Sequence, residues 1–518
     1  MAIPIIDIFA GPGGLGEGFS AVTDNNNKRA FKIVLSIEKD INAHQTLQLR
    51  SFFRQFEIGM VPKDYYEFVK GNITLEELYN KWPKEYINAK NEAWNIELGD
   101  SKNSESSENV DAKIVSALEN SKNWLLIGGP PCQAYSVVGR SRRQEKLLDE
   151  KTDERVGLYK QYLRILAVHN PSVFIMENVK GLLSAETKDS PIFSKILKDL
   201  SDPVKVYITE FGNENKKLDC PGYKIYSLVA DCKAFDLEGN PTYDQKDYII
   251  KSENYGVPQT RHRVILLGIR KTLNVLPNTI KARKKIPISK VLNGLPKLRG
   301  GLSKTEDSNE AWKKTINEIL TKDLLAGAAA QVKDEILREL KHLRQPRLQT
   351  GGEYIPQKTI NIKYENEWFL DRNLDGVCNH ASRGHMASDL HRYFFAACYA
   401  KIQKASPKLE NFPINLLPEH KNVKEGIDDK KFADRFRVQL WNKPAKTITS
   451  HISKDGHYYI HPDPTQCRSL TVREAARIQT FPDNYFFCGP RTSQFIQVGN
   501  AVPPLLAFTI AKIISNLI

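Results

Sequence analysis

The stretch IPIIDIFAGPGGLGEGF, residues 3–19, sets the fold class of this 518-residue chain. An apolar run ends at a cluster of glycines, and a helical pattern follows directly. Glycines at a strand-to-helix turn let the backbone approach a ligand, and they leave free N–H groups at the start of the helix. The stretch therefore predicts a strand, a ligand-binding turn and a helix, which is the first unit of an open α/β sheet. The glycines are at positions 11, 13, 14, 16 and 18.

The alternation of strands and helices continues through the first third of the chain. FKIVLSIEKD at 31–40 predicts a second strand that ends in an acid. NWLLIGG at 123–129 and SVFIMEN at 172–178 predict two more strands, with a helical pattern at 157–170 between them. Strands that alternate with helices favour a parallel, doubly wound sheet.

The pattern divides the chain into three parts. Residues 1–270 predict a catalytic and cofactor-binding domain, in which about 50–110 (Arg50 to Val110) reads as a polar insertion with a surface loop at its end. Residues 271–466 are irregular and predict a second, smaller domain of mixed, loop-rich character. Residues 467–518 predict a turn and apolar helices that return to the first domain.

Bulk composition is that of a globular protein, with 41% hydrophobic and 26% charged residues. No run of 18 apolar residues occurs, so no membrane span is expected, and the N-terminus reads as a first strand and not as a signal peptide. Seven cysteines without a C-x-x-C pair predict reduced thiols and no metal site. A cytoplasmic protein is expected.

The basic residues are unevenly distributed. Lys and Arg number 75 against 61 Asp and Glu, a net charge of +14. Residues 270–347 alone hold 18 basic and 8 acidic residues, an excess of 18 − 8 = +10. Such a concentration is expected of a surface that meets phosphates, although solvated helix faces such as KDEILRELKHLR also contribute to it.

Glu38 points to the kind of ligand. It follows the second predicted strand, roughly 20 residues after the glycine turn, where a carboxylate accepts hydrogen bonds from both hydroxyls of a ribose. The glycine spacing differs from G-x-G-x-x-G, which disfavours a dinucleotide. The turn and the acid together predict a cofactor that contains a nucleoside.

Cys132 follows a predicted strand and two prolines in NWLLIGGPPCQAYSVVGRSRR, residues 123–143. A thiol is reactive only when a cationic or hydrogen-bonding neighbourhood favours its thiolate, which arginines 140, 142, 143, 261 and 263 could provide. Glu177 ends another strand and would supply a carboxyl group beside the thiol. Taken singly, the cysteine could be a core residue, Glu177 a helix cap, and Arg261 the partner of a carboxylate.

The order of these motifs resembles that of DNA (cytosine-5)-methyltransferases of the bacterial modification type. The resemblance covers most of residues 1–268 and 468–518, and residues 271–466 take the place of the family's target-recognition domain. It implies a class I S-adenosylmethionine-dependent methyltransferase, with a Rossmann-like sheet domain. The motifs are DIFAGPGGLGEGF (7–19), IEKD (37–40), GGPPCQAYS (128–136), MENVKGL (176–182), GVPQTRHRVILLG (256–268), TVREAARIQTFPD (471–483) and VGNAVPP (498–504).

The resemblance also implies the chemistry. The Cys132 thiolate would add to C6 of a flipped-out cytosine, Glu177 would bind N3, and methylation at C5 would follow. Gln133, Arg261 and Arg263 would complete the catalytic group, with Arg263 orienting the base or the loop after Cys132. The cofactor would be S-adenosyl-L-methionine.

The cofactor residues implied by the resemblance form one set, in which the acid that binds the adenine is the open position. Asp100 is the first candidate for it, and Asp111 is the alternative. The set comprises Phe9, Ala10, Gly11, Gly14, Leu15, Glu38, Asp100, Pro130, Leu158, Asn500 and Val502.

The implied partner is double-stranded DNA at a specific sequence. A cognate restriction endonuclease would act on the same sequence without forming a stable complex, and the enzyme would be a monomer at the bacterial nucleoid. Three alternatives stay open: a tRNA cytosine-5 methyltransferase, an inactive DNA-binding relative, and a nicotinamide or flavin oxidoreductase with a redox thiol.

Overall fold

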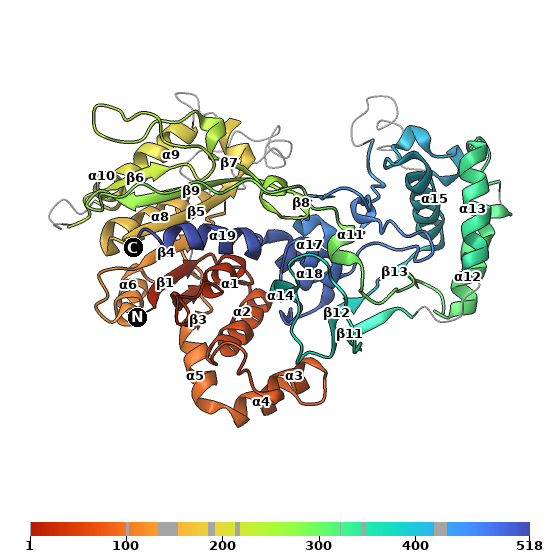
Figure 1. Ribbon diagram of the computed structural model, residues 1–518, viewed down its shortest axis with the longest axis horizontal. Coiled ribbons are helices and arrows are strands. Elements are labelled where there is room, and N and C mark those ends of the chain that lie inside the picture. Colours follow the sequence, from red (N-terminus) through yellow and green to blue (C-terminus); the bar gives the residue numbers. More distant parts are fainter. Residues whose placement is uncertain are drawn as a thin grey trace.

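The structure is a computed structural model that describes residues 2–99, 103–131, 154–184, 192–212, 218–321, 323–343, 349–418 and 433–518. Cys132, Gln133, Asp100 and the arginines at 140, 142 and 143 lie outside the described residues. Figure 1 shows a sheet domain that carries both chain termini, and a smaller lobe at the opposite end of the molecule.

One mixed sheet of eight strands forms the centre of the larger domain. Its order is β3-β2-β1-β4-β5-β9-β6, and β7 also pairs with β9. The strands from β3 to β5 are parallel, whereas β9 runs antiparallel to β5, β6 and β7. The strands are β1 (Ile3–Ile8), β2 (Phe31–Ile37), β3 (Ala93–Trp94), β4 (Leu125–Gly128), β5 (Val173–Val179), β6 (Tyr223–Tyr226), β7 (Ile249–Lys251) and β9 (His262–Arg270).

The expectation of an α/β fold is confirmed, and the four strands predicted from the alternating pattern, β1, β2, β4 and β5, are parallel. The later strand β9 joins the same sheet in the antiparallel direction. The chain passes from β7 to β9 through the short helix η4 (Ser252–Tyr255) and the two-residue strand β8 (Gln259–Thr260). A parallel neighbour needs a crossover connection of a dozen or more residues, usually helical. The short link therefore brings β9 back in the opposite direction.

Helices cover both faces of the sheet because alternate strand residues point to opposite sides. In β1, Ile5 belongs to the core under α1 (Gly14–Ser20) and α19 (Pro504–Ile514). Ile6 and Ile8 belong to the core under the helices of the other face. These are α6 (Ser107–Leu118), α8 (Glu154–His169) and α9 (Ile192–Ser201).

The C-terminal helices are built into the sheet domain. A Cβ added to Gly18 of α1 would lie 2.4 Å from the Pro504 carbonyl oxygen, so this glycine permits the close packing of α1 on α19. Among the described residues, Arg491–Ile514 is the one stretch long and apolar enough to cross a membrane, and its apolar 18-residue part is 72% buried. It consists of α18 (Arg491–Asn500) and α19, and each is shorter than the roughly 20 residues that a membrane span needs.

The segment expected to be a polar insertion from Arg50 to Val110 is a folded helical unit, and its bounds differ from that expectation. Arg50 lies inside α2 (Ile41–Arg54) and Val110 inside α6. Apolar residues spaced along the polar sequence bury a common core, which the composition alone concealed. The helices between are α3 (Lys63–Val69), α4 (Leu75–Lys81) and α5 (Pro83–Glu92).

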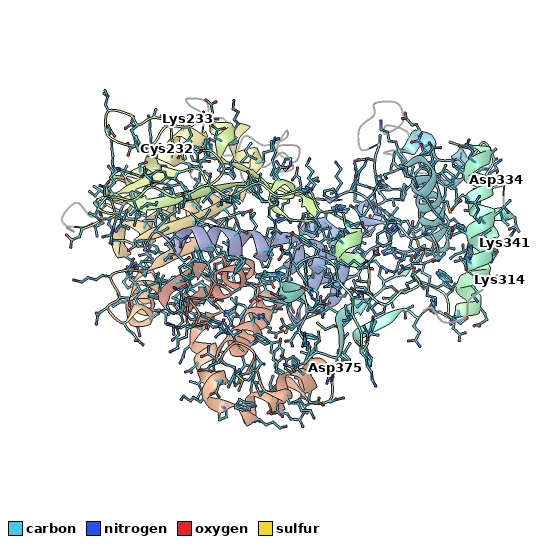
Figure 2. The ribbon with its side chains drawn as sticks, in the orientation of Figure 1. Cys232, Lys233, Lys314, Asp334, Lys341 and Asp375 are labelled. Carbon is cyan, nitrogen blue, oxygen red and sulfur yellow. The ribbon has the colours of Figure 1, made fainter. Side chains whose placement is uncertain are left out.

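The smaller lobe has its own apolar core, built from helices α12 (Asn309–Asn317), α13 (Ala330–His342) and α15 (Ala387–Gln403). Helix α13 is amphipathic: it buries Ile336 and exposes charged side chains on the opposite face. Figure 2 shows Lys314, Asp334 and Lys341 on the outer side of this lobe. An antiparallel pair, β11 (Gly351–Pro356) with β12 (Gly376–Ala381), lies between the lobe and the sheet domain.

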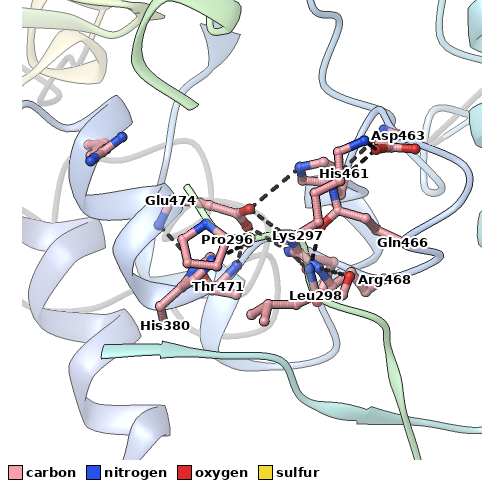
Figure 3. Close-up of polar contacts among 12 residues, drawn as sticks. Pro296, Lys297, Leu298, His380, His461, Asp463, Gln466, Arg468, Thr471 and Glu474 are labelled. Carbon is pink, nitrogen blue, oxygen red and sulfur yellow. Dashed lines mark hydrogen bonds and ion pairs between the residues drawn. The ribbon is translucent and has the colours of Figure 1, made fainter. Parts of the chain in front are cut away.

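A buried polar network around α17 (Val472–Ile478) joins the two parts (Figure 3). Both carboxylate oxygens of Glu474 accept from the Arg468 guanidinium at 2.7 Å, and Thr471 N–H donates to Glu474 at 2.8 Å. His461 Nε2 lies 3.4 Å from the same carboxylate. His380 is hydrogen-bonded to Thr471 Oγ1 at 2.9 Å. The surrounding apolar core takes residues from before and after position 466, so the boundary predicted there crosses a shared core.

Candidate functional site

A cavity of about 530 Å³ opens at the carboxyl ends of β1, β2, β4 and β5. Open α/β sheets bind ligands at this edge, and the volume suits a ligand of nucleoside size or larger. Because β9 is antiparallel, its first residues reach the same edge. Both Arg261 and Arg263 therefore line the cavity together with Glu177.

Nearly all the described residues that the sequence singled out meet here. Pro131, the last described residue before Cys132, also lines the wall. Among the described residues, no group of three potential metal ligands occurs. The predicted cofactor residues on the wall are Phe9, Ala10, Gly11, Gly14, Leu15, Glu38, Pro130, Leu158, Asn500 and Val502.

The turn after β1 has a backbone that favours glycine. Gly11 and Gly13 have left-handed φ values of 57° and 91°, and Phe9 also has φ 57°. A Cβ on Gly14 would lie 2.4 Å from the Val502 carbonyl oxygen, so any side chain there would separate the turn from the C-terminal segment. The turn thus exposes backbone to the cavity at the start of α1.

Glu38 is held by backbone N–H groups at both carboxylate oxygens. Gly11 N–H donates to Oε2 and Asp40 N–H donates to Oε1, each at 2.8 Å. Burial raises the pKa of Glu38, while these hydrogen bonds act in the opposite direction. Each oxygen keeps a lone pair, so the carboxylate can still accept from a ligand's hydroxyl groups.

The sequence reasoning missed the residues that follow β3. Ile96 and Leu98 line the cavity and offer apolar walls beside Glu38. The Asn95 side chain donates to the carbonyl oxygens of Glu38 and Lys39, at 2.8 and 3.1 Å. The available signal was the alternation of Trp94, Ile96 and Leu98 with polar residues, a short strand-like pattern inside a polar segment.

Asp111, the alternative adenine acid, is engaged elsewhere. Its Oδ1 accepts from Arg164 Nη1 at 2.7 Å and lies 2.7 Å from His169 Nε2. Asp111 does not line the cavity. These contacts tie α6 to α8 and hold Asp111 outside the cavity, so the structure does not bring it together with the other predicted cofactor residues.

Glu177 and Arg263 form an ion pair on the wall of the cavity. Arg263 Nε lies 2.9 Å from Glu177 Oε1. The other oxygen, Oε2, faces Gly129, where an added Cβ would come within 3.1 Å of it. The carboxyl group therefore lies beside the Gly129–Pro131 segment, which leads directly into Cys132.

Arg261 is buried and bonds to backbone. Its Nη1 donates to the carbonyl oxygens of Ile448 and Gly499, at 2.9 and 3.2 Å. Burial, together with the nearby Arg263, lowers the pKa of Arg261 to about 9. Arg261 thus joins three segments that build the cavity wall, and its position favours a supporting role over contact with a substrate.

Asp7 adds an acidic group beneath the glycine turn. It lines the cavity, is 1% exposed, and neither carboxyl oxygen has a well-formed hydrogen bond within the described residues. Burial raises the pKa of Asp7 to about 8. With that pKa the acid is mostly protonated near pH 7, and a positively charged ligand beside it would favour its ionised form.

Known proteins resemble this chain over almost its full length. The family model for C-5 cytosine-specific DNA methylases matches residues 66–203 and 215–516. The type II methyltransferase M.Bpa9945I of Bacillus paralicheniformis is 32% identical over 529 residues, which span 99% of each protein. M.DdeI of Desulfomicrobium norvegicum, also a type II methyltransferase, is 26% identical over 99% of this chain and 88% of the relative. The DNA (cytosine-5-)-methyltransferase M.ApeKI of Aeropyrum pernix is 24% identical over 76% of this chain and 81% of its own.

Proposed function

The chain belongs to the family of C-5 cytosine-specific DNA methylases, and we propose that it methylates C5 of one cytosine within a specific duplex sequence through a covalent bond between Cys132 and C6. The observation that carries this mechanism is the position of Glu177. Its carboxyl group shares one cavity with the glycine turn and Glu38, and it adjoins the segment that enters Cys132.

The residues that line the cavity support S-adenosyl-L-methionine as the cofactor. Glu38 would accept from the ribose hydroxyls, Ile96 and Leu98 would contact the adenine, and the turn at Phe9–Gly14 would lie along the rest of the molecule. Asp7 would face its positive charge. When bound, this cofactor supplies an electrophilic methyl group. Asp100 stays the proposed acid for the adenine amino group.

Cys132 would provide the nucleophile. Its thiolate would add to C6 of the flipped base, the π electron pair of the C5–C6 double bond would shift over C5, C4 and N3, and C5 would become nucleophilic. After methylation, C5 loses its proton and the thiolate leaves C6, which regenerates both the aromatic ring and the enzyme. Gln133, next along the chain, would belong to the same loop.

Glu177 would stabilise the ring during addition. A carboxyl group at N3 hydrogen-bonds or protonates the nitrogen where negative charge develops. The ion pair with Arg263 orients Glu177, and Arg263 would also meet the base or a phosphate. Arg261 would act as a positioning residue, because its bonds go to backbone.

Two of the relatives are named type II methyltransferases, which supports our proposal that this enzyme belongs to a restriction–modification pair. The protein would act as a monomer at the bacterial nucleoid and would protect a sequence that the cognate endonuclease cuts. The tRNA and oxidoreductase alternatives lack support, because the matching family methylates cytosine in DNA.

The direct test supplies methyl-labelled S-adenosylmethionine with duplex DNA of mixed sequence or with tRNA. We expect label at C5 of cytosine in DNA only, and none with the Cys132→Ser variant. Label absent from DNA with the wild-type protein, or equal label with Cys132→Ser, would contradict the proposal. Bisulfite sequencing of the labelled DNA then identifies the recognition sequence.

A further inference from the structure

Exposed lysines gather where the chain leaves the sheet domain. Residues 281–285, KARKK, lie between β9 and α11 (Ser289–Leu292), and all five are exposed. Backbone bonds from Ile288 N–H to the Lys443 carbonyl at 3.0 Å and from Ser289 N–H to the Trp441 carbonyl at 3.1 Å fix this segment against residues 441–446. The exposed lysines of residues 281–290 and 441–446, here called the basic strip, are Lys281, Lys284, Lys285, Lys290, Lys443 and Lys446.

Within the described part of the chain, the positive charges of the basic strip are not paired with acidic side chains. Among the described ion pairs, none involves any of its six lysines. Arg283, within the same segment, pairs with Glu365 and lies over the Tyr364 ring, with 5.7 Å between its guanidinium carbon and the ring centroid. Uncompensated like charges repel one another, and a polyanion removes that repulsion.

The basic strip begins beside the reaction cavity. β14 (Ala445–Lys446) pairs in parallel with β8, directly before Arg261. Thr449, three residues beyond Lys446, lines the cavity, so at most about 11 Å of chain separates them. The Arg283 N–H donates to the Asn254 carbonyl oxygen at 2.7 Å, which holds residues 281–285 against η4, the helix that precedes β8.

We propose that the basic strip binds the phosphate backbone of duplex DNA that flanks the methylated site. The inference rests on the proposed function, since the cavity must receive a base from that duplex. Lysine ammonium groups contact phosphates as point charges and carry no base specificity, so the strip lengthens the bound duplex without changing the sequence that is read. An acidic protein surface is the competing occupant, but the continuity with the cavity favours DNA.

The test compares two triple variants with equal loss of charge. K281Q/K284Q/K285Q alters the basic strip, whereas the control K32Q/K84Q/K90Q alters exposed lysines of β2 and α5 that form no ion pair among the described residues. Fluorescence anisotropy across a range of salt concentrations gives the affinity for duplexes of about 40 and about 12 base pairs that share one central sequence. The methyl-transfer rate on saturating short duplex provides a check on folding.

With the long duplex, we expect the strip variant to reduce the slope of log K against log salt by about 3, since each lost phosphate contact contributes about 0.9. The short duplex, the control variant and the methyl-transfer rate should match wild type. If the slope on the long duplex is unchanged in the strip variant, or if it changes equally on the short duplex, the basic strip does not bind the flanking DNA. If the slopes of wild type and strip variant differ as expected but the wild-type protein transfers no methyl group, the role of the basic strip is supported and the proposed function is contradicted. If the wild-type protein transfers methyl groups but the two slopes are equal, the proposed function is supported and the role of the basic strip is contradicted.

Discussion

At the scale of single residues, the cavity depends on two carboxylates that are held in different ways. Backbone N–H groups hold Glu38, which fixes its orientation whatever ligand is present. A guanidinium holds Glu177 at one oxygen, and the other oxygen faces the segment that leads into Cys132. The first arrangement suits binding, and the second suits a group that must respond to charge developing on a ring.

Replacing Glu177 by Gln should lower the single-turnover rate of methyl transfer by about 10²- to 10⁴-fold, because the amide cannot protonate N3. Affinity for the cofactor, measured by calorimetry, should stay near wild type. Glu253→Gln is the matched control, since Glu253 is also buried and pairs with a basic residue, His262, at 2.9 Å. A Glu177→Gln enzyme that retains the wild-type rate would remove Glu177 from the mechanism.

Replacing Glu38 by Gln should weaken S-adenosylmethionine binding by about 10- to 100-fold, because hydrogen bonds to a charged acceptor are lost and one amide end faces an N–H donor. Calorimetry without DNA measures this directly. Glu97→Gln, at the rim and paired with Lys39 at 3.0 Å, should leave the affinity unchanged. Equal affinities for the two variants would refute the ribose assignment.

At the scale of elements, α17 shows how buried charge connects the two parts of the molecule. Its N-terminal Thr471 and Glu474 cap each other, and Glu474 also receives the Arg468 guanidinium. These interactions lower the pKa of Glu474 although burial opposes this. Burial lowers the pKa values of His380 and His461 to about 4, so both are neutral near pH 7.

These histidines make stability depend on pH. Between their ordinary pKa of 6.5 and about 4, the unfolded chain binds protons that the folded protein does not, so stability falls as pH falls through this window. The loss approaches about 3 kcal/mol for each histidine at the lower limit. Urea unfolding from neutral pH to about pH 5 should show a falling midpoint, with a smaller fall in His461→Gln. A midpoint that rises on acidification would contradict this account.

At the scale of the whole molecule, the helical insertion braces the sheet domain against residues beyond position 350. The core it shares includes Tyr354, Leu374 and Cys378. Hydrogen bonds continue the contact: Tyr66 Oη and Asn484 Nδ2 both donate to Asp371 Oδ2 at 2.7 Å. Asn484 also accepts from Arg50, which pairs with Glu17 of α1.

Removing the Tyr66 hydroxyl should therefore lower the free energy of unfolding of the whole protein by about 1 kcal/mol. Tyr66→Phe is compared with Tyr86→Phe, whose hydroxyl has no hydrogen bond among the described residues, in urea unfolding experiments. Methyl transfer at saturating DNA should be unchanged in both variants. If the two variants have equal free energies of unfolding, the hydrogen bond of Tyr66 does not contribute to the stability of the whole protein.

Local sequence patterns were sufficient to predict the turn after β1, the position of Glu38 after β2 and the strand that presents Glu177, because each of these features depends on a few consecutive residues. Long-range pairing was beyond them. The direction of β9 depends on its partners, and β3 is a two-residue strand that follows a long insertion. Arg468, Arg473 and Arg477 look like surface residues in the sequence, yet each is fully buried, because their partners come from distant segments.

The central claim is a temporary bond between Cys132 and the pyrimidine ring, and DNA that contains 5-fluorocytosine tests it most directly. Fluorine cannot leave C5 as a proton does, so the enzyme should stay attached after methylation. The DNA carries 5-fluorocytosine in place of the cytosine that the enzyme methylates, and the methyl donor is present. We expect an adduct of protein and DNA that survives denaturation, and mass spectrometry should locate the bond on the peptide that contains Cys132. The Cys132→Ser variant should form no adduct. A wild-type protein that methylates ordinary DNA but forms no adduct, or forms it at another residue, would contradict the account.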